Sequence, residues 1–294
     1  MNITAQQVKE LREKTGAPMM DCKNALTEAQ GDMAEAEVVL RKRGIAVAQK
    51  KAGRTAQEGL VEAVVRPDGA LGAMIEINCE SDFVARTDAF QAFLKTISEL
   101  VAKEDPEHVD ALLAANYPGA AHSVREALGE MVGKLGENIV VRRFVRYDRT
   151  GDGWIASYLH HGKIGVMVEA SSEGPATDAL KDALKDIAMH IAASDPRCIN
   201  RDEVDPKLLA TEREIQGARA RAEGKPEKII EKMVEGRLGK FFEEICLLEQ
   251  PFIRETNMSV AQWLASKSVE IGKVTIKRFA RFKVGEGVVA SSGE

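Results

Sequence analysis

Two adjacent histidines, His160 and His161, are the residues best suited by type to acid–base chemistry. A catalytic histidine also needs a nucleophile or carboxylate beside it in a pocket, and a metal site needs a third ligand. The spacing supplies neither. We interpret the pair as an exposed polar turn or a partner contact; a metabolic enzyme built around it is an alternative. His190 lies on the apolar face of an expected helix and is interpreted as a core histidine.

The four cysteines lack the spacing that metal or disulfide chemistry requires. None belongs to a C-x-x-C pair, and they lie far apart in the sequence. Zinc sites and disulfide frameworks show closely and regularly spaced cysteines. The pattern predicts no metal site and no disulfide, and it is typical of a protein in the reducing cytoplasm. The four are Cys22, Cys79, Cys198 and Cys246.

Motifs that bind phosphate or support hydrolysis are absent from the sequence. No Gly-Lys pair is followed by Ser or Thr, and neither H-E-x-x-H nor G-x-S-x-G occurs. One near-match to a dinucleotide fingerprint, Gly285-x-Gly287-x-x-Ala290, is followed by only four residues. No helix can form there to receive a pyrophosphate. We therefore expect no cofactor and no catalytic residue, so the protein is not expected to be an enzyme.

Composition indicates a folded protein with an acidic balance. The 294 residues, 44% of them hydrophobic, suggest about two domains. The N-terminus is too polar for a signal peptide, and no apolar run approaches the roughly 18–20 residues that span a bilayer. We expect a cytoplasmic protein without membrane contact.

The charge balance argues against direct nucleic-acid binding. The 41 Lys+Arg against 46 Asp+Glu give a net charge of -5, whereas nucleic-acid-binding domains usually carry a basic excess. The alternative is a ribosome- or RNA-associated protein, for which a steep salt dependence of RNA binding is expected. Its candidate basic groups are Lys42, Arg43, Lys50, Lys51 and the strand 277–283.

Residues 1–44 carry the signals of three short helices. A capping box begins the first helix at Thr4, and Gly16 ends it. A second helix is expected from about residue 19 to 30, and a third from Asp32 to Gly44. The arrangement resembles the ubiquitin-associated type of three-helix bundle.

The start of the second helix and the segment after the third each allow two interpretations. Met19 and Met20 either fill the core or form an adaptable apolar contact for a partner. Residues 45–59 are interpreted as a linker with a helical start and a solvated basic face.

The rest of the chain contains an internal repeat. Each copy predicts a β-hairpin, an amphipathic helix and, later, a closing strand, which indicates two α+β subdomains of similar plan. The hairpins turn at 67–69 and at 161–162. The matching segments are Gly72–Glu76 with Gly165–Glu169, Thr87–Ile97 with Thr177–Ile187, and Arg143–Tyr147 with Arg278–Phe282.

The second copy carries an insertion between its helix and its last strand. Asp205 and Pro206 begin one helix, and a second runs from Pro226 to about Leu247. They predict an antiparallel helical hairpin. Its apolar surface packs on its own scaffold, on a second copy or on a partner. The residues expected between the helices are Leu208, Ile215 and Ala218, facing Ile230, Met233, Val234 and Phe241.

The first copy has a longer loop between its hairpin and its helix. Residues 78–86 replace what is a plain turn at 171–176 in the second copy. Phe83 and Val84 lie in this loop, which is expected at the surface. Phe83 either folds back over the end of the helix or is an exposed aromatic wedge that enters a partner.

Several segments in order resemble bacterial translation elongation factor Ts. The resemblance extends from residue 2 to about 287 and implies a guanine-nucleotide exchange factor of elongation factor Tu. It implies that the chain binds the GDP form and the nucleotide-free form of that partner and binds no nucleotide itself. The segments are LREKTGAPMMDCKNAL (11–26), EINCESDFVAR (76–86), GENIVVRR (136–143), AMHIAA (188–193) and KMVEGRLGKF (232–241).

The resemblance also implies contact residues. The three-helix module is expected to dock on the nucleotide-binding domain of the partner. The family motif T-D-F-V, whose Asp and Phe intrude between two helices beside the magnesium site, appears here with Ser in place of Thr. The hairpin motif implies that His160 is pressed against the partner, and the helical hairpin implies a coiled-coil or homodimer module. The expected contacts are Leu11, Met19, Met20, Ser81, Asp82, Phe83, Val84 and His160.

The predicted architecture is therefore α+β. A three-helix module resembling the ubiquitin-associated type (1–54) precedes a first core subdomain (55–149) and a second (150–289). The helical hairpin is inserted in the second at about 200–247, and a tail (290–294) follows.

Overall fold

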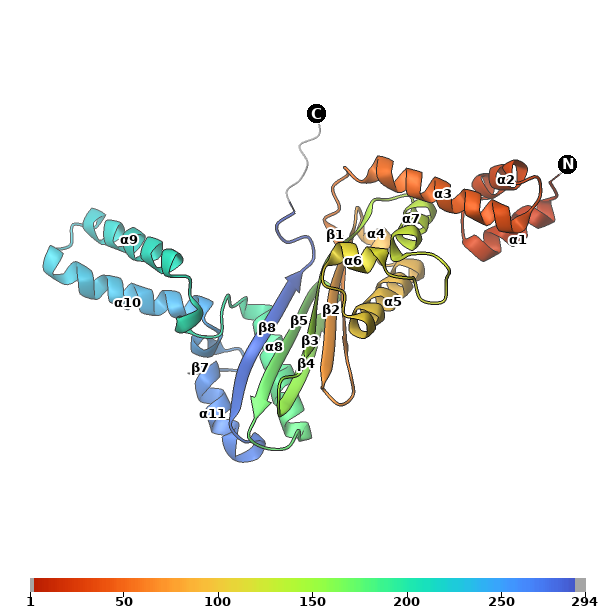
Figure 1. The fold of residues 1–294 in the computed structure, drawn as a ribbon. Coiled ribbons are helices and arrows are strands. Elements are labelled where there is room, and N and C mark those ends of the chain that lie inside the picture. Colours follow the sequence, from red (N-terminus) through yellow and green to blue (C-terminus); the bar gives the residue numbers. More distant parts are fainter. Residues whose placement is uncertain (1–2, 289–294) are drawn as a thin grey trace.

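The computed structural model describes residues 3–288 and has a mixed α+β fold (Figure 1). The expected tail 290–294 lies outside the described residues. Two antiparallel three-stranded sheets lie between a helical module at one end and a helical hairpin at the other. The strands are β1 (Glu58–Val65), β2 (Leu71–Cys79), β3 (Ile139–Asp148), β4 (Gly153–His160), β5 (Ile164–Ser172), β6 (Pro251–Phe252), β7 (Glu255–Ser259) and β8 (Val274–Lys283).

Helices surround the two sheets, whose strand orders are β1-β2-β3 and β4-β5-β8. Short 3-10 turns occupy 201–203 and 247–249. The helices are α1 (Ala5–Thr15), α2 (Met19–Glu28), α3 (Met33–Lys51), α4 (Asp82–Ala85), α5 (Asp88–Glu104), α6 (Val109–Ala114), α7 (Val124–Leu135), α8 (Asp178–Ser194), α9 (Pro206–Ala222), α10 (Glu227–Ile245) and α11 (Val260–Ile271).

The N-terminal module has the three expected helices, and the local signals explain two of their ends. The Thr4 side chain accepts from the Gln7 N–H, while the Gln7 side chain accepts from the Thr4 N–H, so the capping box is present. Gly16 ends α1 at φ 68, a left-handed conformation that favours glycine. Helix α2 ends at Glu28, two residues before the expected end.

The expected end of the third helix at Gly44 was wrong. Helix α3 continues to Lys51 because Gly44 lies in a crossing with α7 rather than at a helix terminus. A Cβ on Gly44 would lie 2.8 Å from the Gly129 carbonyl oxygen, and one on Gly133 would lie 3.3 Å from the Gly44 Cα. Glycine is needed here for close approach of two backbones. The expected helical start of the linker is therefore the packed end of α3, and residues 52–57 connect it to β1.

Each subdomain has the predicted hairpin, helix and closing strand. Every residue of β2 is buried, and its side chains alternate between two packing surfaces. Ile75 and Ile77 face α5, where Phe90, Leu94 and Ile97 complete a core. Each of these side chains contributes roughly 1.5–3 kcal/mol by burial. The second subdomain repeats the arrangement with Val166, Val168, Leu180, Leu184 and Ile187.

The other faces of the two sheets pack against each other through the residues that the repeat shares. Gly72 lies against the Met167 sulfur and Gly165 against the Met74 sulfur, at positions where a Cβ would come within 2.6 and 2.9 Å. The backbone contacts are also reciprocal, since the Val61 N–H donates to the Gly162 oxygen (2.7 Å) and the Ile155 N–H to the Gly69 oxygen (3.1 Å).

Two buried carboxylates repeat this reciprocity. Arg143 pairs with the buried Glu76 (2.6 Å) and stacks on Phe282 of the other sheet at 4.3 Å. Arg278 pairs with the buried Glu169 (2.6 Å) and stacks on Tyr147 at 4.0 Å. In each case an arginine pairs with a carboxylate of its own subdomain and stacks on an aromatic ring of the other subdomain.

The insertion forms the predicted antiparallel hairpin, which projects away from the second subdomain (Figure 1). Asp205 caps α9, Pro206 is its first residue, and Gly224 lies in the turn at φ 71, as expected. The expected inward face of α9 was wrong. Gly217 and Ala220 lie between the helices, because small residues allow close approach, whereas Ile215 and Ala218 are exposed. Facing them on α10 are Ile230, Val234 and Leu238.

Candidate partner-binding surface

The longer loop of the first subdomain forms a helical turn that presents Phe83 to solvent. Ser81 caps the four-residue helix α4 by accepting from the Val84 N–H. The Phe83 side chain is 80% exposed, and the alternative that it folds back over the helix was therefore wrong. A large exposed apolar side chain on an ordered turn has the properties of an interface anchor.

The turn is held in place by a carboxylate far away in the sequence. Glu137 accepts from the Glu80 N–H (3.1 Å), the Ser81 N–H (2.9 Å) and the Ser81 hydroxyl (2.5 Å). In return, the Glu80 carboxylate accepts from the Asn138 N–H at 2.7 Å. Charge-assisted hydrogen bonds of this kind are the stronger ones, so the backbone that carries Phe83 is fixed before any partner arrives.

Asp82 and Val84 flank Phe83 and have opposite environments. Asp82 forms an ion pair with Arg86 across one helical turn at 2.7 Å, and both side chains reach solvent. Val84 is only 8% exposed and packs in the core of the first subdomain. The Val84 side chain therefore anchors the turn from inside, and its expected contact with a partner stays a prediction.

The tip of the second hairpin carries the two histidines. His161 has a positive φ of 52, followed by Gly162 at 66. Both histidines are exposed, with ring centroids 4.5 Å apart and edge to face. The Tyr158 hydroxyl lies 3.1 Å from Nδ1 of His160 and orients that ring. The tip therefore displays an oriented pair of exposed rings.

The hairpin tip and the Phe83 turn lie at the same end of the two sheets. Lys163, next to the tip, bonds the Glu58 carboxylate (2.6 Å) and the Gly59 oxygen (3.1 Å) at the start of β1. Glu58 in turn pairs with Cys79, the last residue of β2 before the turn. The structure thus brings together two expected contact sites from different subdomains.

The N-terminal module places its expected contacts differently. Met19 and Met20 are exposed at the start of α2, so they do not fill the core. Leu11 is fully buried among Val8, Leu26 and other core residues of the module. Leu11 therefore supports the module from inside, and its expected contact with a partner stays a prediction.

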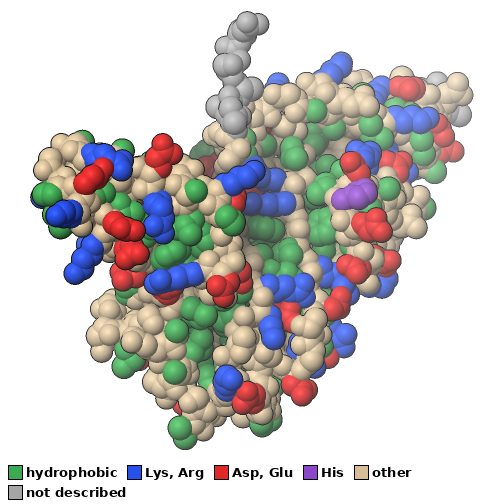
Figure 2. Space-filling view, turned by 60° about the vertical axis from the view of Figure 1, so that its left-hand side comes forward, with side chains coloured by type: hydrophobic (Ala, Val, Ile, Leu, Met, Phe, Trp, Pro, Cys, Tyr) green, Lys and Arg blue, Asp and Glu red, His purple; other side chains and the backbone are tan. Residues whose placement is uncertain are grey.

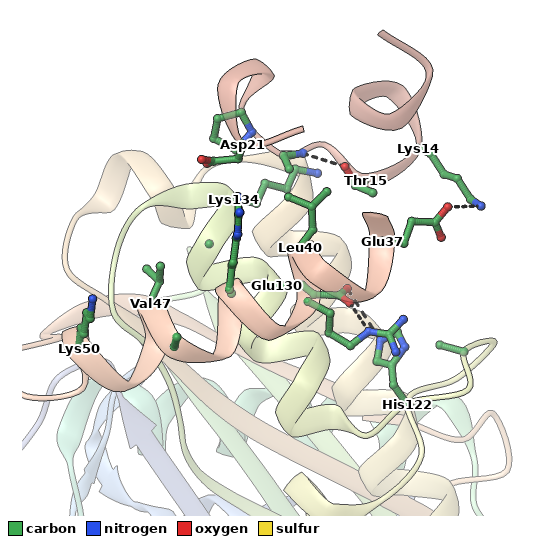
Figure 3. A pocket seen from close by; sticks show the side chains of 18 of the residues that line it. Lys14, Thr15, Asp21, Glu37, Leu40, Val47, Lys50, His122, Glu130 and Lys134 are labelled. Carbon is green, nitrogen blue, oxygen red and sulfur yellow. Dashed lines mark hydrogen bonds and ion pairs between the residues drawn. The ribbon is translucent and has the colours of Figure 1, made fainter. Parts of the chain in front are cut away.

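A cavity of about 700 Å³ separates the module from α7 and the loop before it (Figure 3). One ion pair bridges its walls, Arg41 of α3 with Glu130 of α7 (3.0 Å), and another, Lys14 with Glu37 (2.5 Å), lies within the module. Most of its carboxylates are thus neutralised by neighbouring cations, and no nucleophile with a base beside it lines the cavity. We interpret it as a gap between two bodies that the α3–α7 crossing holds together.

Buried ionisable groups elsewhere have structural environments. Burial lowers the pKa of His190, whose Nδ1 accepts from the Ile253 N–H (3.3 Å) while Nε2 faces the Gln250 oxygen (2.9 Å). The ring is therefore neutral with its proton on Nε2, which confirms the interpretation of a core histidine. Burial, with Glu137 nearby, raises the pKa of the Cys79 thiol to about 12. Residues 3–288 contain no cluster of three His, Cys, Asp or Glu side chains arranged for a metal ion.

Two positioning residues escaped the sequence analysis. Glu137 lies 56 residues from Ser81, and no local pattern links the two. Tyr158 precedes His160 by two residues on one strand, so the period-2 alternation of β-strands could have placed both on one face.

Among the described helices, none is long and apolar enough to span a membrane.

Comparisons with known proteins agree on one family. The family model "Elongation factor TS" matches residues 80–286. A protein of Trichlorobacter lovleyi named elongation factor Ts is 45% identical over 294 residues, covering 98% of this chain and 94% of the relative. Proteins of the same name from Clostridium perfringens (47% identity; 97% and 94% coverage) and Nitrosospira multiformis (47%; 99% and 93%) are similar to an equal degree.

Proposed function

The chain belongs to the elongation factor Ts family and is a guanine-nucleotide exchange factor for elongation factor Tu in translation elongation, and we propose that it releases GDP by inserting the Phe83 turn into the nucleotide-binding domain of that partner. The observation that carries this proposal is the 80% exposure of Phe83 on a turn whose backbone is hydrogen-bonded to Glu137. Preorganised anchors bind well because little freedom is lost on association.

The proposed mechanism is thermodynamic coupling. The factor and GDP each bind the partner, and each weakens the binding of the other by the same factor. Phe83 and Asp82 enter between two helices beside the magnesium site, and displacing those helices removes contacts from the phosphates and the ion. GDP then leaves, and GTP later displaces the factor. No covalent step is involved, so the protein acts without being an enzyme.

Two further contacts complete the proposed interface. Met19 and Met20 dock the N-terminal module on the nucleotide-binding domain, since exposed methionines adapt to a partner surface. His160, oriented by Tyr158, presses on the partner from the hairpin tip beside the Phe83 turn. Simultaneous contact by module, turn and tip would fix the position of the exposed Phe83 ring on the partner.

The proposed partners are proteins only. The protein binds the GDP form and the nucleotide-free form of elongation factor Tu in the cytoplasm, and a second copy of itself through the exposed residues of the helical hairpin, Ile215 and Ile229. We propose no direct nucleic-acid contact, because lysine and arginine side chains are interspersed with acidic ones on the face shown in Figure 2. RNA binding with a steep salt dependence would favour the alternative function.

The test is release of fluorescent GDP from elongation factor Tu by substoichiometric protein. The wild type should accelerate release and turn over many partner molecules. Phe83→Ala removes roughly 150–200 Å² of apolar surface from the interface, which is worth about 4–5 kcal/mol at about 25 cal/mol per Å². Its exchange rate per unit concentration should fall about 500- to 5000-fold at about 1.36 kcal/mol per tenfold, with the free energy of unfolding unchanged within about 0.5 kcal/mol.

The neighbouring residue supplies the matched control. Val84→Ala deletes two buried methyl groups and should cost about 1–2 kcal/mol of stability, while the folded variant keeps most of its exchange activity. A wild-type protein without effect on GDP release refutes the proposed function. If Phe83→Ala instead lost stability and exchange activity to the same extent as Val84→Ala, Phe83 would have a structural role and not a partner contact.

A further inference from the structure

Cys198 and Cys246 form a close pair of thiols at the base of the inserted helical hairpin. Their sulfur atoms lie 3.6 Å apart, although 48 residues separate them. One precedes α9, and the other directly follows α10. Cys22 and Cys79, in contrast, have only non-cysteine partners at their sulfurs among the described hydrogen bonds.

The backbone already has the geometry that a disulfide requires. Cys198 and Cys246 form an isolated parallel β-bridge, and the Leu247 N–H donates to the Cys198 oxygen at 2.9 Å. Bridged strands lie about 4.8 Å apart, within the 4.4–6.8 Å of Cα separation that disulfides span. The sulfurs need to approach by only about 1.6 Å to reach the bond length of about 2.05 Å, which is within reach of side-chain rotation.

The surroundings of the pair keep both cysteines as protonated thiols. Cys246 is fully buried and Cys198 is 7% exposed. Burial raises the pKa of both thiols, that of Cys246 to about 12, so both stay protonated at neutral pH. Thiols react mainly as thiolates, so the pair is slow to oxidise and only sustained exposure to an oxidant converts it. The apolar residues around it are Val204, Leu209, Phe241, Phe242 and Ile245.

We propose that Cys198 and Cys246 are a redox modification site that a hydroperoxide converts into a reversible disulfide. The Cys198 sulfur, which is nearer to solvent, attacks one peroxide oxygen; the O–O bond breaks, and water leaves as Cys198 becomes a sulfenic acid. The Cys246 sulfur then attacks the Cys198 sulfur, the S–S bond forms and a second water leaves. Two thiols are oxidised and one peroxide is reduced to two waters. A dithiol reductant reverses the product by thiol–disulfide exchange.

The disulfide would join the two ends of the hairpin where they leave the second subdomain. In the reduced protein the hairpin base is held by backbone hydrogen bonds, by the apolar cluster and by the Arg201–Glu249 ion pair (2.5 Å). A covalent link there restrains the angle at which α9 and α10 project. It acts on any contact that the hairpin makes and leaves the Phe83 turn, in the other subdomain, untouched.

The experiment treats the native full-length protein with hydrogen peroxide. Remaining thiols are blocked with N-ethylmaleimide in denaturant, and trypsin digestion is followed by mass spectrometry. The expected product is peptide 198–201 linked to peptide 241–254, with a mass two hydrogens below their sum, which dithiothreitol separates. The thermal unfolding midpoint should rise by several degrees on oxidation, since a cross-link that closes a long loop constrains the unfolded chain.

Two controls make the result decisive. Cys198→Ser with Cys246→Ser should show no peroxide-dependent rise in the unfolding midpoint, while Cys22 and Cys79 remain available. In a second arm, peroxide is added to protein unfolded in urea, where random pairing is expected. A linked peptide that forms only in urea, or native oxidation confined to Cys22 and Cys79, overturns the proposal.

Discussion

Replacing Gly44 with alanine tests whether the α3–α7 crossing positions the N-terminal module. An alanine Cβ at this position would lie 2.8 Å from the Gly129 oxygen and 3.1 Å from its carbonyl carbon. Both are backbone atoms of a helix, so neither can rotate away. Gly236 in α10 is the matched control, because a Cβ there meets no atom within 4 Å.

The same substitution should have opposite signs at the two positions. Glycine-to-alanine in a helix gains about 0.5–1 kcal/mol from backbone entropy, and Gly236→Ala should show this gain alone. At Gly44 the overpacked crossing costs about 1–3 kcal/mol, which leaves a net loss of about 0.5–2 kcal/mol. The two variants should therefore differ by about 1–3 kcal/mol in the free energy of unfolding.

Urea unfolding followed by far-UV circular dichroism measures this difference, and the GDP-release assay measures its functional effect. Gly44→Ala should raise the concentration of factor needed for half-maximal exchange, because the module and the Phe83 turn no longer meet the partner together. The maximal rate should change less. Equal stabilisation by Gly44→Ala and Gly236→Ala would refute the reasoning, since it would mean that the helices separate at no cost.

Three further predictions concern other parts of the molecule. Burial lowers the pKa of His190 below its ordinary 6.5, so near pH 6 the unfolded chain binds a proton that the folded protein does not. The free energy of unfolding should therefore fall as the pH drops below about 6.5. In urea titrations at several pH values, His190→Gln should flatten this slope. Arg278→Met leaves the buried Glu169 unpaired and should cost about 2–4 kcal/mol by the same measurement, with Arg278→Met/Glu169→Gln recovering part of it. Ile215→Lys with Ile229→Lys should shift sedimentation toward the monomer while changing stability by less than about 0.5 kcal/mol; an unchanged sedimentation coefficient would contradict a dimer through this face.

Elements whose signals are local could be predicted from the sequence. The capping box at Thr4, the glycine stop at Gly16 and the Asp205–Pro206 helix start all act within one helical turn. The exposed Phe83 was also within reach, because comparison of the two repeats isolates a loop that only one copy has. Repeats are informative in this way since shared residues maintain the scaffold and unshared ones are free for function.

Elements that depend on tertiary contacts could not be predicted. Gly44 has the sequence signature of a helix stop, and only the approach of Gly129 makes it a crossing residue. Ile215 has the size of a core residue, yet the hairpin closes on Gly217, since short side chains bring the helix axes nearer. The pairing of Cys198 with Cys246 and the support of Ser81 by Glu137 both bridge long stretches of chain, for which a single sequence carries no spacing rule.

The reciprocal glycine and methionine contacts between the sheets make this chain a tethered pair of like halves. Neither half can cover its second sheet face alone, because Gly72 is fitted to Met167 and Gly165 to Met74. The peptide link keeps each half at a high effective concentration of the other, so the association survives any dilution. A fragment that contained only one half would instead be expected to associate with further copies of itself through this sheet face. Substitutions at the glycine–methionine contacts should be tolerated only when the glycine and its methionine partner change together.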